Sequence, residues 1–248
     1  MSPESPKAEK VRIAAVGDLH VREHHFQPYH DLFTKVSDVA DILLLCGDLT
    51  NTGLPKEAEN LAFSLSQCKI PVIGVLGNHD VQAEEVDEVK KILSQAKFKF
   101  LDDEIFQFHG IGFAGVKGFG GGFEKHMLGS FGEEATKIFV AEAVNEALKL
   151  ENALKQLESQ EVSAKVVVLH YAPIRATIAG ESEEIYAYLG SSRLAEVIDR
   201  FENIKFVVHG HAHHAAHSGQ TLKGVPVYNV AFEVLKKSGL DPFLKLEV

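Results

Sequence analysis

The segment GNHD (77–80) places an amide, an imidazole and a carboxylate directly after the apolar run Pro71–Leu76. A tight turn would account for the glycine and the asparagine on conformational grounds. It gives no reason for His79 and Asp80, whose side chains are of the kinds that bind metals and transfer protons. The chemistry of this segment therefore depends on whether other apolar runs end in the same way.

Four further apolar runs end in side chains that can bind a metal. Their ends read GDLH (17–20), GDL (47–49), LHYAP (169–173) and HGHAH (209–213). In an α/β sheet, ligands gather outside the carboxyl ends of the strands. A single Asp or Asn after Gly is usually an ordinary turn residue, but five such ends would need five independent coincidences. The sequence therefore predicts that these side chains meet at one site.

The residue types at these ends favour a pair of divalent cations. Asp18 and His20 are two apart on an extended segment, so their side chains point the same way and can share one cation. Asp48 has two carboxylate oxygens and could bridge two cations. The other donors are Asn78, His170, His211 and His213. Such donors without a thiolate suit manganese, iron or zinc, and two ions about 3.5–4 Å apart can hold a bridging hydroxide and clamp a phosphate.

Short apolar runs that alternate with helical segments must position these side chains, a pattern that favours an α/β fold with a mostly parallel sheet. The predicted strands are Val11–Val16, Ile42–Cys46, Pro71–Leu76, Lys97–Leu101, Glu104–Phe108, Ile111–Val116, Lys165–Leu169, Lys205–Val208, Val225–Phe232 and Phe243–Val248. The predicted helices are Pro28–Val39 and Pro55–Gln67, which both open on a proline, followed by Ala83–Ala96 and Phe131–Ser159. The glycine-rich stretch Gly118–Phe123 predicts a flexible loop, and LGSSRL (189–194) predicts a helix capped by Ser191 or Ser192.

The composition is typical of a globular protein with an acidic surface. The chain has 248 residues, a net charge of −10 and 45% hydrophobic residues. We expect a flexible tail at residues 1–10 and a single domain at 11–248, since no linker or repeat divides the chain. The acidic surface disfavours long nucleic acids as partners. No apolar stretch approaches the roughly 20 residues of a membrane-spanning helix, and the two cysteines lack a disulfide-type spacing, so we expect a cytoplasmic protein.

Taken as an ordered set, the strand ends resemble the pattern of the calcineurin-like metallophosphoesterases, which is D-x-H, GD, GNH(D/E), a lone His and GHxH. The resemblance spans residues 18–213 and therefore most of the chain. It implies two facing mixed β-sheets flanked by helices, in a four-layer sandwich. It also implies two ions, one bound by Asp18, His20, Asp48 and His213 and the other by Asp48, Asn78, His170 and His211.

The same resemblance implies a catalytic role for His79. The family places this histidine beside the metals without ligating them, where it stabilises phosphoryl oxygens or protonates the leaving oxygen, and it places Asp80 to orient the ring. A buried structural histidine is the alternative for His79 taken alone. His209 is two residues from His211, so spacing alone would also allow His209 as a ligand, although the family pattern leaves it outside.

These expectations favour a metal-dependent phosphoesterase that hydrolyses a small phosphomonoester or phosphodiester by attack of the bridging hydroxide. Within the family, compact chains of this length resemble the bacterial class that includes cyclic-nucleotide phosphodiesterases. The alternative is a non-catalytic interaction scaffold on the same fold, like its relative in the retromer coat. A scaffold would have no need of His79 or of seven intact ligand positions. The oligomeric state stays open at this point.

Substrate selectivity is expected from loops beside the metals, because the sheet ends mainly recognise phosphate. The candidate segments are Lys117–Phe131 and Ala172–Gly190. In the first, Phe119 and Phe123 could close over a base or another apolar group, or they could pin the loop to the core. Arg22, two residues after His20, could reach a phosphate or form an exposed ion pair.

Overall fold

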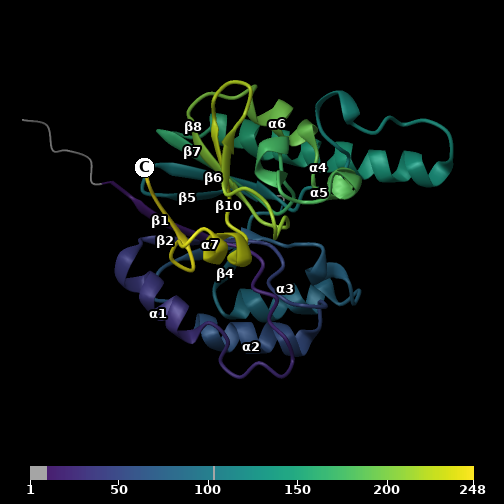
Figure 1. Cartoon of the computed structure of the whole chain (residues 1–248). Helices are drawn as coiled ribbons and strands as arrows, with labels where there is room; N and C mark the ends of the chain where they lie inside the picture. The colour runs from purple at the N-terminus through teal and green to yellow at the C-terminus, as the bar shows by residue number, and fades with distance from the viewer. Residues whose placement is uncertain (1–9, 103) are drawn as a thin grey trace, which may run out of the picture.

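The computed structural model describes residues 10–102 and 104–248, and it arranges the strands of these residues in two mixed sheets (Figure 1). Residues 1–9 of the expected flexible tail lie outside the described residues.

The first sheet holds the N-terminal strands and the C-terminal strand, in the order β11-β1-β2-β3-β4. Their bounds are β1 Arg12–Val16, β2 Ile42–Cys46, β3 Val72–Val75, β4 Phe98–Phe100 and β11 Leu244–Glu247. Strands β1 to β4 pair in parallel, and β11 pairs antiparallel with β1. The carboxyl ends of β1, β2 and β3 therefore lie at one edge of this sheet.

The second sheet follows the order β5-β6-β7-β8-β10-β9. Its strands are β5 Phe106–Phe108, β6 Ile111–Val116, β7 Ala164–Leu169, β8 Ile204–His209, β9 Ser218–Gln220 and β10 Pro226–Asn229. Strands β6, β7, β8 and β10 are parallel, whereas β5 and β9 pair antiparallel at the two edges. The carboxyl ends of β7 and β8 are thus neighbours.

Helices cover the outer faces of both sheets (Figure 1). The first sheet is covered by α1 His30–Val39, α2 Pro55–Leu65 and α3 Val86–Gln95. The second sheet is covered by α4 Glu134–Glu158 and α6 Ser192–Ile198. Two short helices are α5 Tyr186–Leu189 and α7 Phe232–Lys237, and single turns of 3₁₀ helix occupy His79–Val81, Glu124–His126, Arg175–Ile178 and Glu183–Ile185. In the part of the chain that the structure describes, none of these helices combines the length and apolarity needed to cross a membrane.

The two sheets face each other across a shared core, which confirms the predicted α/β fold class of two facing mixed sheets flanked by helices. Strand β7 shows how the layers are divided. Val166 and Val168 belong to the core between the sheets, whereas Val167 and Leu169 pack into the core beneath α4 and α6. Because side chains alternate along a strand and both faces are buried here, the strand reads as a continuous apolar run.

Several predicted elements begin or end elsewhere by a few residues, and two of them show a local cause. Pro55 opens α2 as predicted, but Pro28 precedes α1 instead of opening it. Tyr29 lies between Pro28 and the helix with φ at 59°, so the chain turns before the helix starts. The predicted closing strand Val225–Phe232 is also too long, since β10 ends at Asn229 and Phe232 begins α7.

The helix start at LGSSRL is confirmed. The hydroxyl of Ser191 accepts a hydrogen bond from the main-chain N–H of Arg193 at 3.3 Å, so Ser191 is the residue that caps α6.

Candidate metal centre

The carboxyl ends of β1, β2, β3, β7 and β8 bring the predicted ligands together at one edge of the facing sheets. Several of these residues turn sharply as they leave their strands. The backbone is left-handed at Asp18 (φ 59°), His20 (φ 44°), Asp48 (φ 48°) and His211 (φ 71°). Residues other than glycine adopt this conformation at a cost of about 1–3 kcal/mol each, and such strain gathers at functional sites. The fold therefore keeps these four residues in a backbone conformation that is unfavourable on its own.

The donor atoms form two clusters, and within each cluster all of them lie within 4.8 Å of one another. The first cluster is Asp18, His20, Asp48 and His213, and the second is Asp48, His170 and His211. The amide oxygen of Asn78 lies 2.9 Å from Nε2 of His170, which places Asn78 beside the second cluster. All seven predicted ligands thus converge, and Asp48 is common to both groups.

The tautomer of His170 shows that a cation fits the second cluster. Its Nδ1 donates a hydrogen bond to the carbonyl oxygen of Cys46 at 2.9 Å, so Nε2 carries a lone pair. That lone pair faces the amide oxygen of Asn78 at 2.9 Å and Oδ1 of Asp48 at 3.4 Å. Burial lowers the pKa of His170 well below its ordinary value, so the ring stays neutral. When Asp48 is ionised, three electron-pair donors face one another, and a cation between them would relieve their repulsion.

Glycine precedes four of these ligands, and the glycines before Asn78 and His211 have a steric reason beside the carboxylates. A Cβ on Gly77 would lie 2.1 Å from Oδ1 of Asp48, and a Cβ on Gly210 would lie 2.2 Å from Oδ2 of Asp18. No side chain can occupy that space without displacing a carboxylate. The glycines of the GN and GH pairs therefore let neighbouring strand ends approach closely enough for their donors to share one site.

Carboxyl groups are concentrated at the centre, where burial makes their ionised form costly. Burial raises the pKa of Asp48 to about 9, and the nearby carboxylates of Asp18 and Asp80 raise it further. The hydrogen bond from Nε2 of His213 to Oδ1 of Asp18, at 2.9 Å, raises the pKa of that histidine. Ionised carboxylates buried beside imidazoles that burial keeps neutral, such as that of His170, are costly on their own, and a bound divalent cation would remove this cost.

His79 lies beside the clusters, but Asp80 does not orient its ring, which corrects the role expected for Asp80. Nδ1 of His79 lies 2.6 Å from the carbonyl oxygen of Asn51. The carboxylate of Asp80 is fully buried and accepts hydrogen bonds from the main-chain N–H groups of Leu49, Thr50 and Gly77 and from the Thr50 hydroxyl. Asp80 is surrounded by main-chain donors because its chain turns inward in the 3₁₀ helix, so it ties together the loops that carry Asp48 and Asn78.

His209 is not part of either cluster. Its ring is fully buried, with Nδ1 at 2.8 Å from the carbonyl oxygen of Gly210 and Nε2 at 2.7 Å from the hydroxyl of Thr177. Both ring nitrogens contact groups outside the two clusters. His209, which its spacing from His211 allowed as a ligand, is therefore not in position to bind a cation there.

A cleft of about 530 Å³ opens over the first cluster. Arg22 lies on its wall, as expected for a residue that could reach a phosphate. Several other lining residues were not among the predicted site residues, and they include His25, Tyr29, Asn51 and Phe232. Asn51 lies three residues after Asp48, and this proximity is the one feature of the sequence that could have indicated a place near the site.

The glycine-rich stretch is packed, so the prediction of a flexible loop is wrong. The main-chain N–H groups of Gly121 and Gly122 donate to the carbonyl oxygens of Ala187 and Gly190 at 2.7 and 3.0 Å. Phe123 is only 3% exposed and belongs to a buried apolar cluster. Its ring therefore does not close over the metal centre in this structure, because the glycines let the loop dock on the segment that follows His170.

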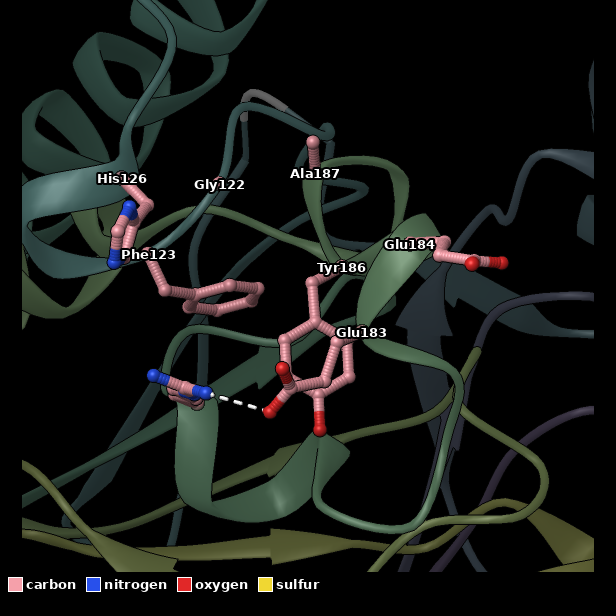
Figure 2. Close-up of a pocket in the computed structure, with 8 residues that line it drawn as sticks. Gly122, Phe123, His126, Glu183, Glu184, Tyr186 and Ala187 are labelled. Carbon is pink, nitrogen blue, oxygen red and sulfur yellow. Dashed lines mark hydrogen bonds and ion pairs between the residues drawn. The ribbon is translucent and has the colours of Figure 1, made fainter.

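Phe123 instead forms part of a separate cavity of about 320 Å³ (Figure 2). Figure 2 shows the rings of Phe123, Tyr186 and His126 around this cavity. Arg175 and Glu183 also line it, and they form an ion pair of 2.9 Å. None of the seven predicted ligands lines it. Phe119 has a different place, since its half-buried ring packs on Phe139 and Tyr171 with centroid distances of 4.8 and 5.8 Å.

A sequence model of the calcineurin-like phosphoesterase family matches residues 11–215, which is most of the chain. The chain belongs to the calcineurin-like phosphoesterases. The match includes all five strand ends of the centre, from Asp18 to His213, and this family is the one that the strand ends resemble.

Two relatives are similar to this chain in sequence, and two solved structures are similar to it in fold. The chain is 24% identical to a 3′,5′-cyclic-nucleotide phosphodiesterase of Nostoc sp. over 215 residues, 82% of this chain and 71% of the relative. It is 27% identical to an uncharacterised protein of Methanocaldococcus jannaschii over 206 residues, 82% of this chain and 80% of the relative. In fold it is similar to phosphopantetheinyl hydrolase of Mycobacterium tuberculosis (TM-score 0.66, 13% identity, 94% of this chain and 95% of the other). It is also similar to TT1561 of Thermus thermophilus (TM-score 0.57, 17% identity, 91% of both chains).

Proposed function

We propose that this chain hydrolyses a small phosphomonoester or phosphodiester at a centre of two divalent cations. The observation that carries the proposal is the pair of donor clusters that share Asp48. One cation would be held by Asp18, His20, Asp48 and His213, and the other by Asp48, Asn78, His170 and His211. Oxygen and imidazole donors without a thiolate suit manganese, iron or zinc.

When bound, the cations would neutralise charge on the phosphate and lower the pKa of water to near neutrality. The protein would hold the substrate and move a proton. Nε2 of His79 lies 4.0 Å from Oδ2 of Asp48 and therefore faces the clusters, while Nδ1 is held by the carbonyl oxygen of Asn51. Because Nδ1 donates its proton to that carbonyl oxygen, Nε2 carries a proton only in the imidazolium form of the ring. That proton would be directed toward the place where a leaving oxygen would depart. Arg22, on the wall of the cleft, would hold a phosphate oxygen.

A 3′,5′-cyclic nucleotide is the first diester to consider, because the phosphodiesterase relative from Nostoc matches 82% of this chain. The cleft of about 530 Å³ is within the range of roughly 300–1,000 Å³ that is common for small-molecule sites. Tyr29 and Phe232 contribute aromatic surface to it, and their rings meet edge to face at 5.4 Å. Such a wall would support the flat base of a nucleotide beside the phosphate site.

The test is a hydrolysis assay on protein that has been stripped with a chelator and then reloaded with manganese, iron or zinc. We expect hydrolysis of a phosphomonoester, a generic phosphodiester or a cyclic nucleotide, dependent on the added cation. Asp48→Ala should lose at least one ion and all measurable turnover, whereas His109→Ala, on the turn between β5 and β6, serves as the matched control. Unchanged ion content and activity in Asp48→Ala would contradict the shared ligand. Two bound ions without turnover of any ester class would favour the interaction scaffold.

A further inference from the structure

Helix α4 has a second apolar stripe, on the side that faces away from the second sheet. Ile138 is 62% exposed, Val144 38% and Leu148 50%, and Ala141 is exposed as well. These positions are three or four residues apart, so they line one face of the helix. A helix on the surface of a monomeric protein ordinarily turns charged and polar side chains outward. The exposed face of α4 is therefore apolar without a covering element among the described residues.

The opposite face of α4 accounts for its packing in the monomer. Its buried side chains there include Val140, Ala143, Ala147, Leu150, Leu154 and Leu157. Figure 1 shows that the N-terminal part of α4, with the segment before it, extends away from the rest of the molecule. Phe131, in that segment, is 86% exposed. Packing within the single chain thus explains why one face of the helix is apolar, and it does not explain why the exposed face is apolar.

Charged residues stand at both ends of the exposed stripe, and the acid precedes the base at each end. The N-terminal end has Glu134, 80% exposed, followed by Lys137. The C-terminal end has Glu151, followed by Lys155, 58% exposed. In the single chain each acid pairs with the base of its own turn, at 4.0 Å for Glu134 and Lys137 and at 2.7 Å for Glu151 and Lys155. An acid and a base therefore precede the apolar residues, and an acid and a base follow them. A stripe with this order is complementary to itself when two copies of the helix run antiparallel.

We propose that the exposed face of α4 is the surface on which two copies of this chain associate, with their α4 helices antiparallel about a two-fold axis between Val144 and Asn145. This arrangement places Glu134 opposite the partner's Lys155. It also places the small side chain of Ala141 opposite the partner's Leu148, so a large residue meets a small one. Such an interface is isologous, because the same patch is used by both copies.

Asn145 gives the pairing a defined register. In this arrangement Asn145 lies next to the axis, beside its own copy, in an otherwise apolar strip. A single polar residue in the seam of two packed helices is known to fix register at some cost in stability. The apolar strip is short compared with the roughly 800 Å² per partner of a standard interface, so we expect a dissociation constant in the micromolar range, about 1 μM or weaker.

The first experiment measures the association state by sedimentation velocity over a range of protein concentrations. We expect the wild-type chain to be a dimer at high concentration and Val144→Glu to be a monomer, because two carboxylates would meet at the axis. Leu222→Glu is the matched control, since Leu222 is fully exposed on the turn between β9 and β10. A wild-type monomer at all concentrations would overturn the proposal, and so would a dimer that survives Val144→Glu.

The second experiment tests the antiparallel register. Glu134→Lys and Lys155→Glu should each weaken the dimer at least several-fold, and the double variant should restore it, while circular dichroism confirms that α4 stays folded. Asn145→Cys should form a disulfide between copies on mild oxidation. Asn152→Cys should not form this disulfide, because residue 152 lies two turns from the axis. The wild type is the control for any disulfide formed by Cys46 or Cys68. Cross-linking through Asn152→Cys alone, or no rescue in the double variant, would contradict the register.

Discussion

The main-chain N–H of His79 donates a hydrogen bond to Oδ1 of Asp48 at 2.9 Å. The proposed catalytic histidine is therefore attached through its backbone to the carboxylate that both donor clusters share. Its ring is held separately, by the carbonyl oxygen of Asn51. Removing the ring leaves the backbone bond in place, so binding of cations and action on the substrate can be separated by mutation.

His79→Ala should retain both cations and lose turnover. We expect the rate to fall by about 10²–10⁴-fold if the ring transfers a proton. The loss should shrink for substrates with good leaving groups, because these need no protonation. The measurement is kcat for a series of aryl phosphoesters of decreasing leaving-group pKa, together with the metal content of each protein. A loss that is uniform across the series would indicate oxyanion stabilisation instead, and no loss would make His79 structural.

The second prediction concerns the stability of the metal-free protein. The raised pKa of Asp48, about 9, means that the folded state retains a proton that the unfolded state has released at neutral pH. The free energy of unfolding contributed by this group is therefore highest below its ordinary pKa near 4 and falls as the pH rises toward 9. Asp48→Asn should stabilise the chelated protein at pH 8 and have little effect near pH 4, with about 2–4 °C in Tm for each kcal/mol.

The measurement is the Tm of chelated wild type and Asp48→Asn across this pH range. Adding a divalent cation should reverse the ranking, because only the wild type then gains binding energy. If the difference between the two chelated proteins did not change with pH, Asp48 would not be the group that titrates.

Most of the centre could be predicted from the sequence because its ligands lie in short segments that follow apolar runs. Asp48 and Asn78 each follow a glycine and an apolar run, and the topology of parallel strands then places them at one edge. The role of Asp80 could not be predicted, since it depends on which loop the side chain meets. Its carboxylate contacts Leu49 and Thr50, which are distant in sequence from it.

The aromatic residues on the walls of the cleft could not be predicted from the sequence either. Tyr29 reaches the cleft because a left-handed turn follows Pro28, and Phe232 reaches it because β10 ends early and α7 begins. The flexibility expected of Gly118–Phe123 was wrong for a related reason. Glycine permits both mobility and close packing, and only the segment that docks on it decides between them.

The third prediction tests the steric role of the glycine before Asn78. Gly77→Ala places a methyl group 2.1 Å from the present position of Oδ1 of Asp48, so the carboxylate must move. We expect loss of at least one cation per chain and a destabilisation of about 1–3 kcal/mol. Gly129→Ala is the matched control, because nothing lies within 4 Å of its added Cβ. Metal analysis and thermal melting provide the two readouts, and full occupancy in Gly77→Ala would show that the site tolerates a displaced Asp48.

The last prediction separates the two phenylalanines of the glycine-rich segment. Phe123 is 3% exposed in a buried cluster, so Phe123→Ala should cost about 3–5 kcal/mol of stability and leave KM unchanged in the protein that remains folded. Phe119 packs on Tyr171, whose ring lies 4.3 Å from that of His211. Phe119→Ala should therefore cost less stability and raise KM for the preferred substrate more than for a small generic phosphodiester. The measurements are thermal melting and steady-state kinetics of the two single variants. An equal rise of KM for both substrates would show that Phe119, like Phe123, serves packing alone.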